Sequence, residues 1–141
     1  MVDFLSRSAR RALMSRIKGK DTEPEKRLRS LLRRAGSSFR TNVASLPGKP
    51  DIVFFRMRVV VFVDGDFWHG YRYIRWKRKV TPYWRDKIET NMRRDRRNFA
   101  RLRRCGWTVV RVWGHELRNK QTGIPRRLLK LLRLRRVGRA R

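Results

Sequence analysis

The sequence predicts one small α/β domain in which helices flank a central mixed β-sheet. The chain has 141 residues, a length typical of one domain, and 40% of them are hydrophobic, which is enough for a modest core. The patterned segments follow in the order helix, helix, strands, helix, strand, helix, an order that favours a mixed sheet covered by helices. We expect a single domain over residues 1–141, with a core at about 8–118 and a basic C-terminal segment at about 122–141.

Two helices are expected before the first strand. A short basic segment at residues 8–18 has helical spacing. A second helix begins after Thr22, where Glu25 three residues later and Pro24 in the first turn form a capping-box pattern, and Gly36 supplies its stop. The apolar positions of this helix follow at three- and four-residue steps and are Leu28, Leu31, Leu32 and Ala35.

A turn and two strands come next. Residues 46–50 read Leu-Pro-Gly-Lys-Pro, a strong turn pattern. The β-rich runs at 51–55 and 58–63 follow, and a short basic connection separates them. They predict an antiparallel pair that is buried on both faces, because neither run alternates cleanly between apolar and polar residues.

The rest of the chain is predicted to hold a long helix, a strand and a last helix. Residues 64–79 have no regular period and mix aromatic with basic side chains. A helix is expected at about 82–104, a strand at 107–113 and a helix at 122–135. The apolar face of the long helix has one gap, which Asp95 fills.

The charge of the chain points to a polyanionic partner. Forty Lys and Arg residues stand against 11 Asp and Glu residues, a formal net charge of +29. Nucleic acid is the natural partner, because neutralising phosphates releases condensed counterions. An anionic membrane surface is the alternative, but no apolar run reaches the ~18 residues of a spanning helix, and no signal-peptide pattern is visible. The single Cys105 excludes an internal disulfide and fits a reducing cytoplasm.

Asp51 and His69 are the first candidates for chemistry. Asp51 follows Pro50 at the start of an apolar strand, where a carboxylate can hold Mg²⁺, although Pro-Asp is also a common turn pair. His69 follows the second strand in a loop with two Asp and two Gly, and histidine can accept a proton from water near neutral pH. The alternative for His69 is an ordinary loop histidine.

Two further carboxylates have both a structural and a functional interpretation. Glu25 fits the capping box, in which its carboxylate accepts a hydrogen bond from the Thr22 backbone. Asp95 lies among arginines on the long helix, where it forms either a half-buried ion pair or a partner for His69. The aromatic residues Phe67, Trp68 and Trp84 suit either the core or stacking between DNA bases.

Taken together, these segments resemble the very-short-patch-repair (Vsr-type) endonucleases, which nick DNA beside T:G mismatches. The resemblance runs from about residue 8 to residue 117 and is specific in order and spacing. Its motifs are Met14-Ser15-Arg16-Ile17, Asp21-Thr22-Glu23-Pro24-Glu25, Leu46-Pro47-Gly48-Lys49-Pro50-Asp51, Phe67-Trp68-His69, Tyr83-Trp84 through Lys87-Ile88, Arg94-Asp95-Arg96-Arg97, and Gly106-Trp107 to Trp113.

The resemblance implies a restriction-endonuclease-like fold and Mg²⁺-dependent hydrolysis of DNA. Asp51 would bind the metal together with the backbone carbonyl of Val63. His69 would be the general base, Glu25 would hold water near the metal, and Asp95 would support His69. The protein is expected to act as a monomer on mismatched double-stranded DNA in the bacterial cytoplasm, associated with the nucleoid through that DNA.

The resemblance also implies a set of DNA contacts. Three aromatic side chains match intercalating residues, and a methionine matches a wedge from the opposite groove. The expected DNA-contacting residues are Met14, Lys49, Phe67, Trp68, Trp84, Arg93 and Arg94. Two alternatives stay open: a nuclease of the same fold with another DNA target, and a non-catalytic basic protein that binds nucleic acid. The joint presence of Asp51, Glu25 and Asp95 argues against the second, because binding alone requires none of them.

Two departures from the family pattern are visible. Better-known members carry a structural zinc site, whose positions here correspond to Asp66, Tyr71, Tyr73 and His115. These side chains are not the four N/S ligands of a structural zinc site, so no structural zinc is expected. The second departure is Val63-Asp64, where those members have Thr-His. Loss of the Thr side chain is tolerable if a backbone carbonyl binds the metal. Asp64 or Asp66 could add a carboxylate to the metal site, and this alternative stays open, although strand parity predicts that Asp64 points away from Val63.

Overall fold

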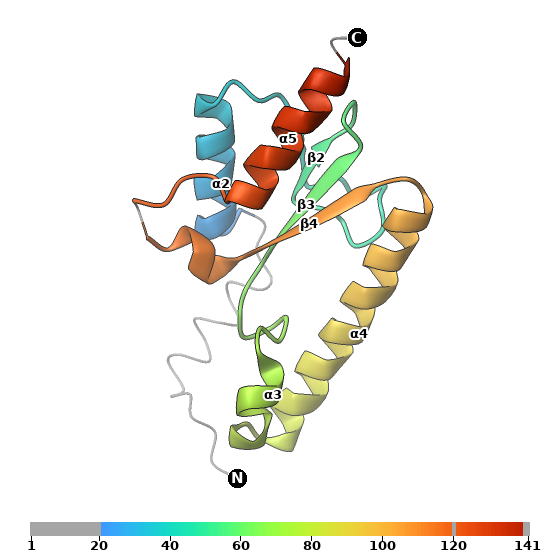
Figure 1. The fold of residues 1–141 in the computed structure, drawn as a ribbon. Coiled ribbons are helices and arrows are strands. Elements are labelled where there is room, and N and C mark those ends of the chain that lie inside the picture. Colours follow the sequence, from blue (N-terminus) through green and yellow to red (C-terminus); the bar gives the residue numbers. More distant parts are fainter. Residues whose placement is uncertain (1–20, 120, 140–141) are drawn as a thin grey trace.

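The computed structural model describes residues 21–119 and 121–139 (Figure 1). The helix expected at 8–18, and Met14 within it, lie outside the described residues. The elements are α2 (Glu23–Arg34), β1 (Arg40–Thr41), β2 (Ile52–Phe54), β3 (Val59–Asp64), α3 (Tyr73–Trp76), η1 (Lys77–Lys79), α4 (Pro82–Arg104), β4 (Thr108–Trp113), η2 (Gly114–Leu117) and α5 (Arg126–Arg139). The expected mixed α/β fold is confirmed.

The four strands form one mixed sheet in the order β1-β2-β3-β4. The first two pairings are antiparallel, and β3 pairs with β4 in parallel. In the register of the central strands, Val61 lies opposite Ile52 on one side and Val110 on the other. The 23-residue helix α4 makes the crossover that a parallel pair requires.

Strand β3 sends alternate side chains to two separate cores. Val59, Val61 and Val63 join a cluster with residues of α2 and α5, while Val60 and Phe62 pack with residues of α4. Figure 1 accordingly shows α2 and α5 on one side of the sheet and α4 on the other. All six residues of β3 are buried, which explains why its sequence shows no apolar–polar alternation.

A third cluster joins α3 to the first turns of α4. Its buried members are Trp68, Tyr73, Val80, Trp84 and Ile88. The cluster therefore anchors the aromatic and basic segment that follows β3, for which the sequence predicted no regular structure. None of the described helices is long and apolar enough to cross a membrane.

Most expected bounds agree with the structure, and two differences have simple causes. The last helix begins at Arg126 instead of residue 122, because Gly123 and Pro125 delay its start. Strand β1 was not predicted, because two exposed residues carry no periodic pattern. The long helix agrees with the predicted 82–104, with Thr81 as its N-cap and Pro82 in the first turn.

Candidate active site

A groove of about 1180 Å³ lies between α2, the loop after β3, and α4. Its walls include Val63, Asp64 and His69 from the end of β3 and the following loop. Arg94 and Asp95 line it from the middle of α4. The groove therefore brings several of the predicted site residues to one place.

Asp51 lies at the beginning of β2, beside the end of β3. Its Oδ2 atom accepts a hydrogen bond of 2.6 Å from the Val63 backbone N–H. Burial raises the pKa of Asp51 to about 8, and the negative charges of Glu25 and Asp64 contribute to the rise. A carboxylate that is this costly to ionise without a cation is a typical ligand for one.

Glu25 caps the start of α2, but the Asp21 N–H and not the predicted Thr22 N–H donates to its carboxylate; its charge also influences Asp51. Its backbone N–H donates to the Thr22 hydroxyl at 3.5 Å, and its own carboxylate accepts from the Asp21 N–H at 3.1 Å. The side chain is buried, and this burial raises the pKa of Glu25. The residue thus completes the cap of α2 and adds a second carboxylate beside Asp51, so both interpretations of Glu25 fit the structure.

The residues around Asp51 fit a Mg²⁺ ion. The hydrogen bond from Val63 uses one carboxylate oxygen of Asp51, which leaves the other for a cation. In a β-strand the N–H and C=O of one residue point to the same side, so the Val63 carbonyl faces the side on which Asp51 lies. Mg²⁺ prefers such a set of few hard oxygen ligands completed by water. The structure therefore offers oxygen atoms that could bind a metal at Asp51 and at the Val63 carbonyl, the two positions that the resemblance implied.

His69 lies between two carboxylates. Its Nδ1 atom is 2.6 Å from Asp95 Oδ2 on α4, and its Nε2 atom is 3.5 Å from Asp64 Oδ1. The Asp95 contact favours the tautomer in which Nδ1 carries the proton, so Nε2, which faces Asp64, is the nitrogen that can accept one. Asp64 points toward α4 as its strand parity predicted, because it bonds to Arg111 and faces His69 on that side.

Arg111 on β4 is a member of this cluster that the sequence analysis missed. Its Nε atom donates to Asp64 Oδ2 at 2.7 Å, and its Nη2 atom donates to Asp95 Oδ2. The available signal was an arginine within the apolar run Val109 to Val112, next to a strand that ends in an aspartate. In a chain with so many arginines, that signal does not distinguish Arg111 from a solvated residue.

Gly70 allows the loop that carries His69 to pack closely against α4. Its φ is +76°, and an added Cβ atom would lie 2.4 Å from the sulfur of Met92. A side chain at this position would push the loop away from the helix. The loop geometry that places His69 beside Asp95 therefore depends on glycine.

Two of the three expected intercalating residues are buried in this structure. Trp68 and Trp84 are 7% and 5% exposed, and their ring centroids lie 5.0 Å apart. Phe67 is partly buried and stacks on Trp76 at 5.4 Å. Trp68 and Trp84 are therefore core residues in this structure, as the alternative interpretation expected. Intercalation by all three rings stays a prediction, and it requires the rings to leave this cluster.

The expected basic contacts take different positions. Arg94 lines the groove and donates to the side chain of Asn91, whereas Arg93 is an exposed residue that donates to Thr90 Oγ1 at 3.2 Å. Lys49 belongs to the turn before Asp51, with a left-handed φ of +52°. Their contacts with DNA stay predictions, as does the wedge role of Met14 outside the described residues.

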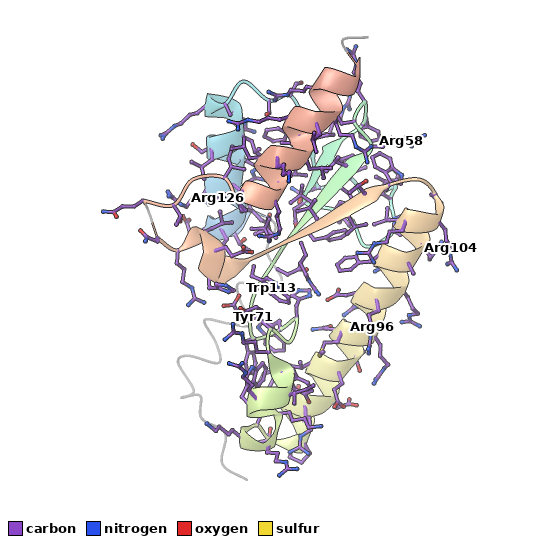
Figure 2. All side chains as sticks on the ribbon, viewed as in Figure 1. Arg58, Tyr71, Arg96, Arg104, Trp113 and Arg126 are labelled. Atoms are coloured by element: carbon purple, nitrogen blue, oxygen red, sulfur yellow. The ribbon has the colours of Figure 1, made fainter. Side chains whose placement is uncertain are left out.

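The positions that correspond to the zinc site hold a different set of contacts. His115 Nδ1 lies 3.1 Å from both carboxylate oxygens of Asp66, and Arg118 lies 3.6 Å from the same carboxylate. The ring of Tyr71 packs on His115 at 4.5 Å and on Trp113 at 5.0 Å; Figure 2 labels Tyr71 and Trp113. The Arg118–Asp66 ion pair, the His115–Asp66 contact and tilted ring contacts therefore join the loop after β3 to η2. The expected absence of structural zinc stays a prediction.

Comparison with known proteins defines the class and then the family. A family model described as DNA mismatch endonuclease Vsr matches residues 2–75, more than half of the chain. The chain is therefore a DNA endonuclease with a restriction-endonuclease-like α/β fold. More narrowly, it belongs to the DNA mismatch endonuclease Vsr family, as the sequence resemblance indicated.

Three curated relatives match over most of their length. The type II nicking enzyme V.XorIIP of Xanthomonas oryzae pv. oryzae is 47% identical over 119 residues, which cover 83% of this chain and 88% of the relative. DNA mismatch endonuclease Vsr of Escherichia coli is 42% identical over 123 residues, covering 86% and 79%. The type II nicking enzyme V.NmeDIP of Neisseria meningitidis serogroup C is 38% identical over 119 residues, covering 82% and 80%.

Proposed function

We propose that the protein nicks one strand of duplex DNA next to a T:G mismatch by Mg²⁺-dependent hydrolysis, and thereby initiates very short patch repair. One observation carries the proposal: two features occur together at the end of β3. The first is a partly buried Asp51, the pKa of which is raised by burial to about 8, and the second is the His69–Asp95 contact. The name of the Escherichia coli relative, DNA mismatch endonuclease Vsr, supports the mismatched target.

Asp51 and the Val63 carbonyl would hold the Mg²⁺ ion. A bound Mg²⁺ ion would supply positive charge that stabilises the negative charge developing on the scissile phosphate. Glu25 would position water beside Asp51, to which its charge is already coupled. Asp51 would therefore be the carboxylate that binds the cation, while Glu25 would act on water and Asp95 on the His69 ring.

His69 would accept a proton from the attacking water at Nε2. Its Nδ1 atom stays bonded to Asp95, so the carboxylate orients the ring and stabilises the imidazolium that forms. The water oxygen forms a bond to phosphorus as the P–O3′ bond breaks. The departing O3′ takes a proton from solvent water, which leaves a 5′-phosphate and a 3′-hydroxyl. The basic groove wall, which includes Arg94, supports binding of the phosphate backbone.

Mismatch preference would come from the cost of opening the base stack. Inserting aromatic rings between base pairs requires local unstacking, and this costs least where pairing is already weak. Phe67 is the most accessible of the three candidate rings, since Trp68 and Trp84 are buried. In this proposal, the protein binds mismatched duplex DNA as a monomer in the bacterial cytoplasm.

The proposal is tested with a panel of matched and mismatched duplexes of one sequence context. We expect one nick beside a T:G pair with Mg²⁺ and none with EDTA. Asp51→Ala should remove cleavage while the variant still binds DNA. Cleavage by Asp51→Ala in Mg²⁺ would contradict the metal assignment, and equal cleavage of matched duplexes would contradict the mismatch target.

The same nuclease with another DNA target is the second candidate. Two of the relatives named above are called type II nicking enzymes, and one of them has the higher identity to this chain. Their names do not mention a mismatch. Nick mapping on a long plasmid without mismatches distinguishes the candidates, because nicks at a recurring matched sequence would favour this second target.

A further inference from the structure

We propose that Arg111 is a positioning residue that fixes the His69 ring for proton transfer; this role rests on the hydrolysis proposed above. Arg111 extends from β4 and its side chain is 24% exposed. Its guanidinium carbon lies 4.4 Å from the centre of the Trp113 ring and 5.0 Å from that of Phe99. Contacts with two aromatic rings restrict the positions that the guanidinium can take.

The guanidinium joins the two carboxylates that face His69. Its Nε atom donates to Asp64 on β3 at 2.7 Å, and its Nη2 atom donates to Asp95 on α4. These same carboxylates lie at the two ring nitrogens, with Asp95 at Nδ1 and Asp64 at Nε2. One side chain therefore sets the spacing of three elements around a single imidazole.

The charge balance explains why a cation is needed there. Asp64 and Asp95 are only 8% and 15% exposed, and two such carboxylates repel each other across the ring. Burying them without a fixed cation would be costly, because each carboxylate would lose the guanidinium that contacts it. With Arg111 present, both carboxylates are paired, and His69 Nδ1 keeps its 2.6 Å contact with Asp95 while Arg111 Nη2 lies 3.3 Å from the same nitrogen.

The same contacts argue that this cluster is not a second metal site. Asp64, His69 and Asp95 each offer a ligand atom, and these atoms lie within 4.8 Å of one another. Arg111 already donates to one oxygen of each carboxylate, Oδ2 of Asp64 and Oδ2 of Asp95. The guanidinium thus supplies positive charge to both carboxylates, which lowers the need for a second divalent cation at this cluster.

The proposal is tested with the full-length variants Arg111→Leu and Arg111→Lys. Arg58→Leu is the matched control, because Arg58 also lies over an indole ring, that of Trp107 at 4.9 Å, yet belongs to the β2–β3 turn. Figure 2 shows Arg58 at the opposite end of the sheet from Trp113. The measurements are the single-turnover nicking rate at saturating DNA, the DNA affinity in EDTA, and the melting temperature.

We expect Arg111→Leu to slow nicking by about 10- to 100-fold while DNA affinity changes by less than about threefold. Arg111→Lys should recover part of the rate, since it restores the charge but not the fork of donors. Arg58→Leu should leave the rate unchanged. An unchanged nicking rate in Arg111→Leu would overturn the proposal. An equal rate loss in Arg111→Lys, with a matching fall in melting temperature in both variants, would overturn it as well.

A spectroscopic measurement separates this proposal from the proposed hydrolysis. The chain has only two histidines, so the ring signals of His69 can be assigned by comparison with His69→Gln. Arg111→Leu should shift the His69 ring signals and leave those of His115, which pairs with Asp66, in place. Unchanged His69 signals would refute the positioning role even if the enzyme hydrolyses DNA, whereas shifted signals in a protein that cleaves no DNA would refute only the hydrolysis.

Discussion

Replacing Asp51 by Asn should stabilise the protein against unfolding when divalent metal is absent. Asn keeps the shape of the side chain and an oxygen that accepts the hydrogen bond from the Val63 N–H. It removes the negative charge that burial and the neighbouring Glu25 make costly. The proposed role of Asp51 as a metal ligand thus implies that its charge destabilises the fold when no metal is bound.

The size of the effect follows from the pKa of Asp51, which rises from 3.8 to about 8. The folded state holds this proton more tightly than the unfolded chain, so wild-type stability falls as pH rises from about 4 to about 8. One pKa unit corresponds to about 1.4 kcal/mol, so the loss at pH 7 has an upper bound of about 4 kcal/mol. Dielectric relaxation around the carboxylate reduces this, and we expect Asp51→Asn to gain about 1–3 kcal/mol.

The assay is urea unfolding of both proteins in EDTA from pH 5 to pH 9. The stability difference in favour of Asp51→Asn should grow with pH and level off above about 8. Adding Mg²⁺ at tenfold its dissociation constant should stabilise the wild type by about 1.4 kcal/mol and leave the variant unchanged. A variant less stable than wild type at pH 7 in EDTA, or a difference independent of pH, would refute the reasoning.

Other predictions concern the neighbouring groups. Asp95→Asn should lower the single-turnover rate by about 10²- to 10⁴-fold with DNA affinity retained, because His69 loses the charge that orients it; a loss confined to affinity would contradict this. Gly70→Ala should cost about 1–3 kcal/mol in the free energy of unfolding, measured in urea, because the new Cβ collides with Met92 at a positive φ. DNA affinity should fall steeply between 50 and 200 mM salt, by about 10³-fold or more if ~6 phosphates are contacted, and a flat titration would contradict phosphate binding.

The elements that the sequence predicts well are those whose pattern is local. The N-caps Thr22 and Thr81, each followed by a proline in the first turn, place the starts of α2 and α4 within a residue. The buried runs of β2 and β3 were recognised because β-branched and aromatic residues fill all but the last position, Asp64. Local chemistry decided these elements, and tertiary packing only reinforced them.

The electrostatic centre of the site was harder to predict, because it depends on contacts between distant segments. Asp95 could be recognised, since it interrupts an apolar helix face. Arg111 could not, because its partner Asp64 lies 47 positions away and the parallel pairing of β3 with β4 brings them together. The burial of Trp68 and Trp84 is likewise a tertiary property, because it depends on packing between the loop after β3 and the first turns of α4.

The last two residues of β3 serve opposite sides of the molecule. Val63 turns its side chain into the core beneath α2 and α5, while the next residue, Asp64, reaches the arginine and histidine on the α4 side. A slip of one position would put the carboxylate into that core and a valine beside His69. The β2–β3 turn therefore constrains the enzyme more than its outer loops do. A change in this turn that shifted the register of β3 would move Val63 away from Asp51 and Asp64 away from His69.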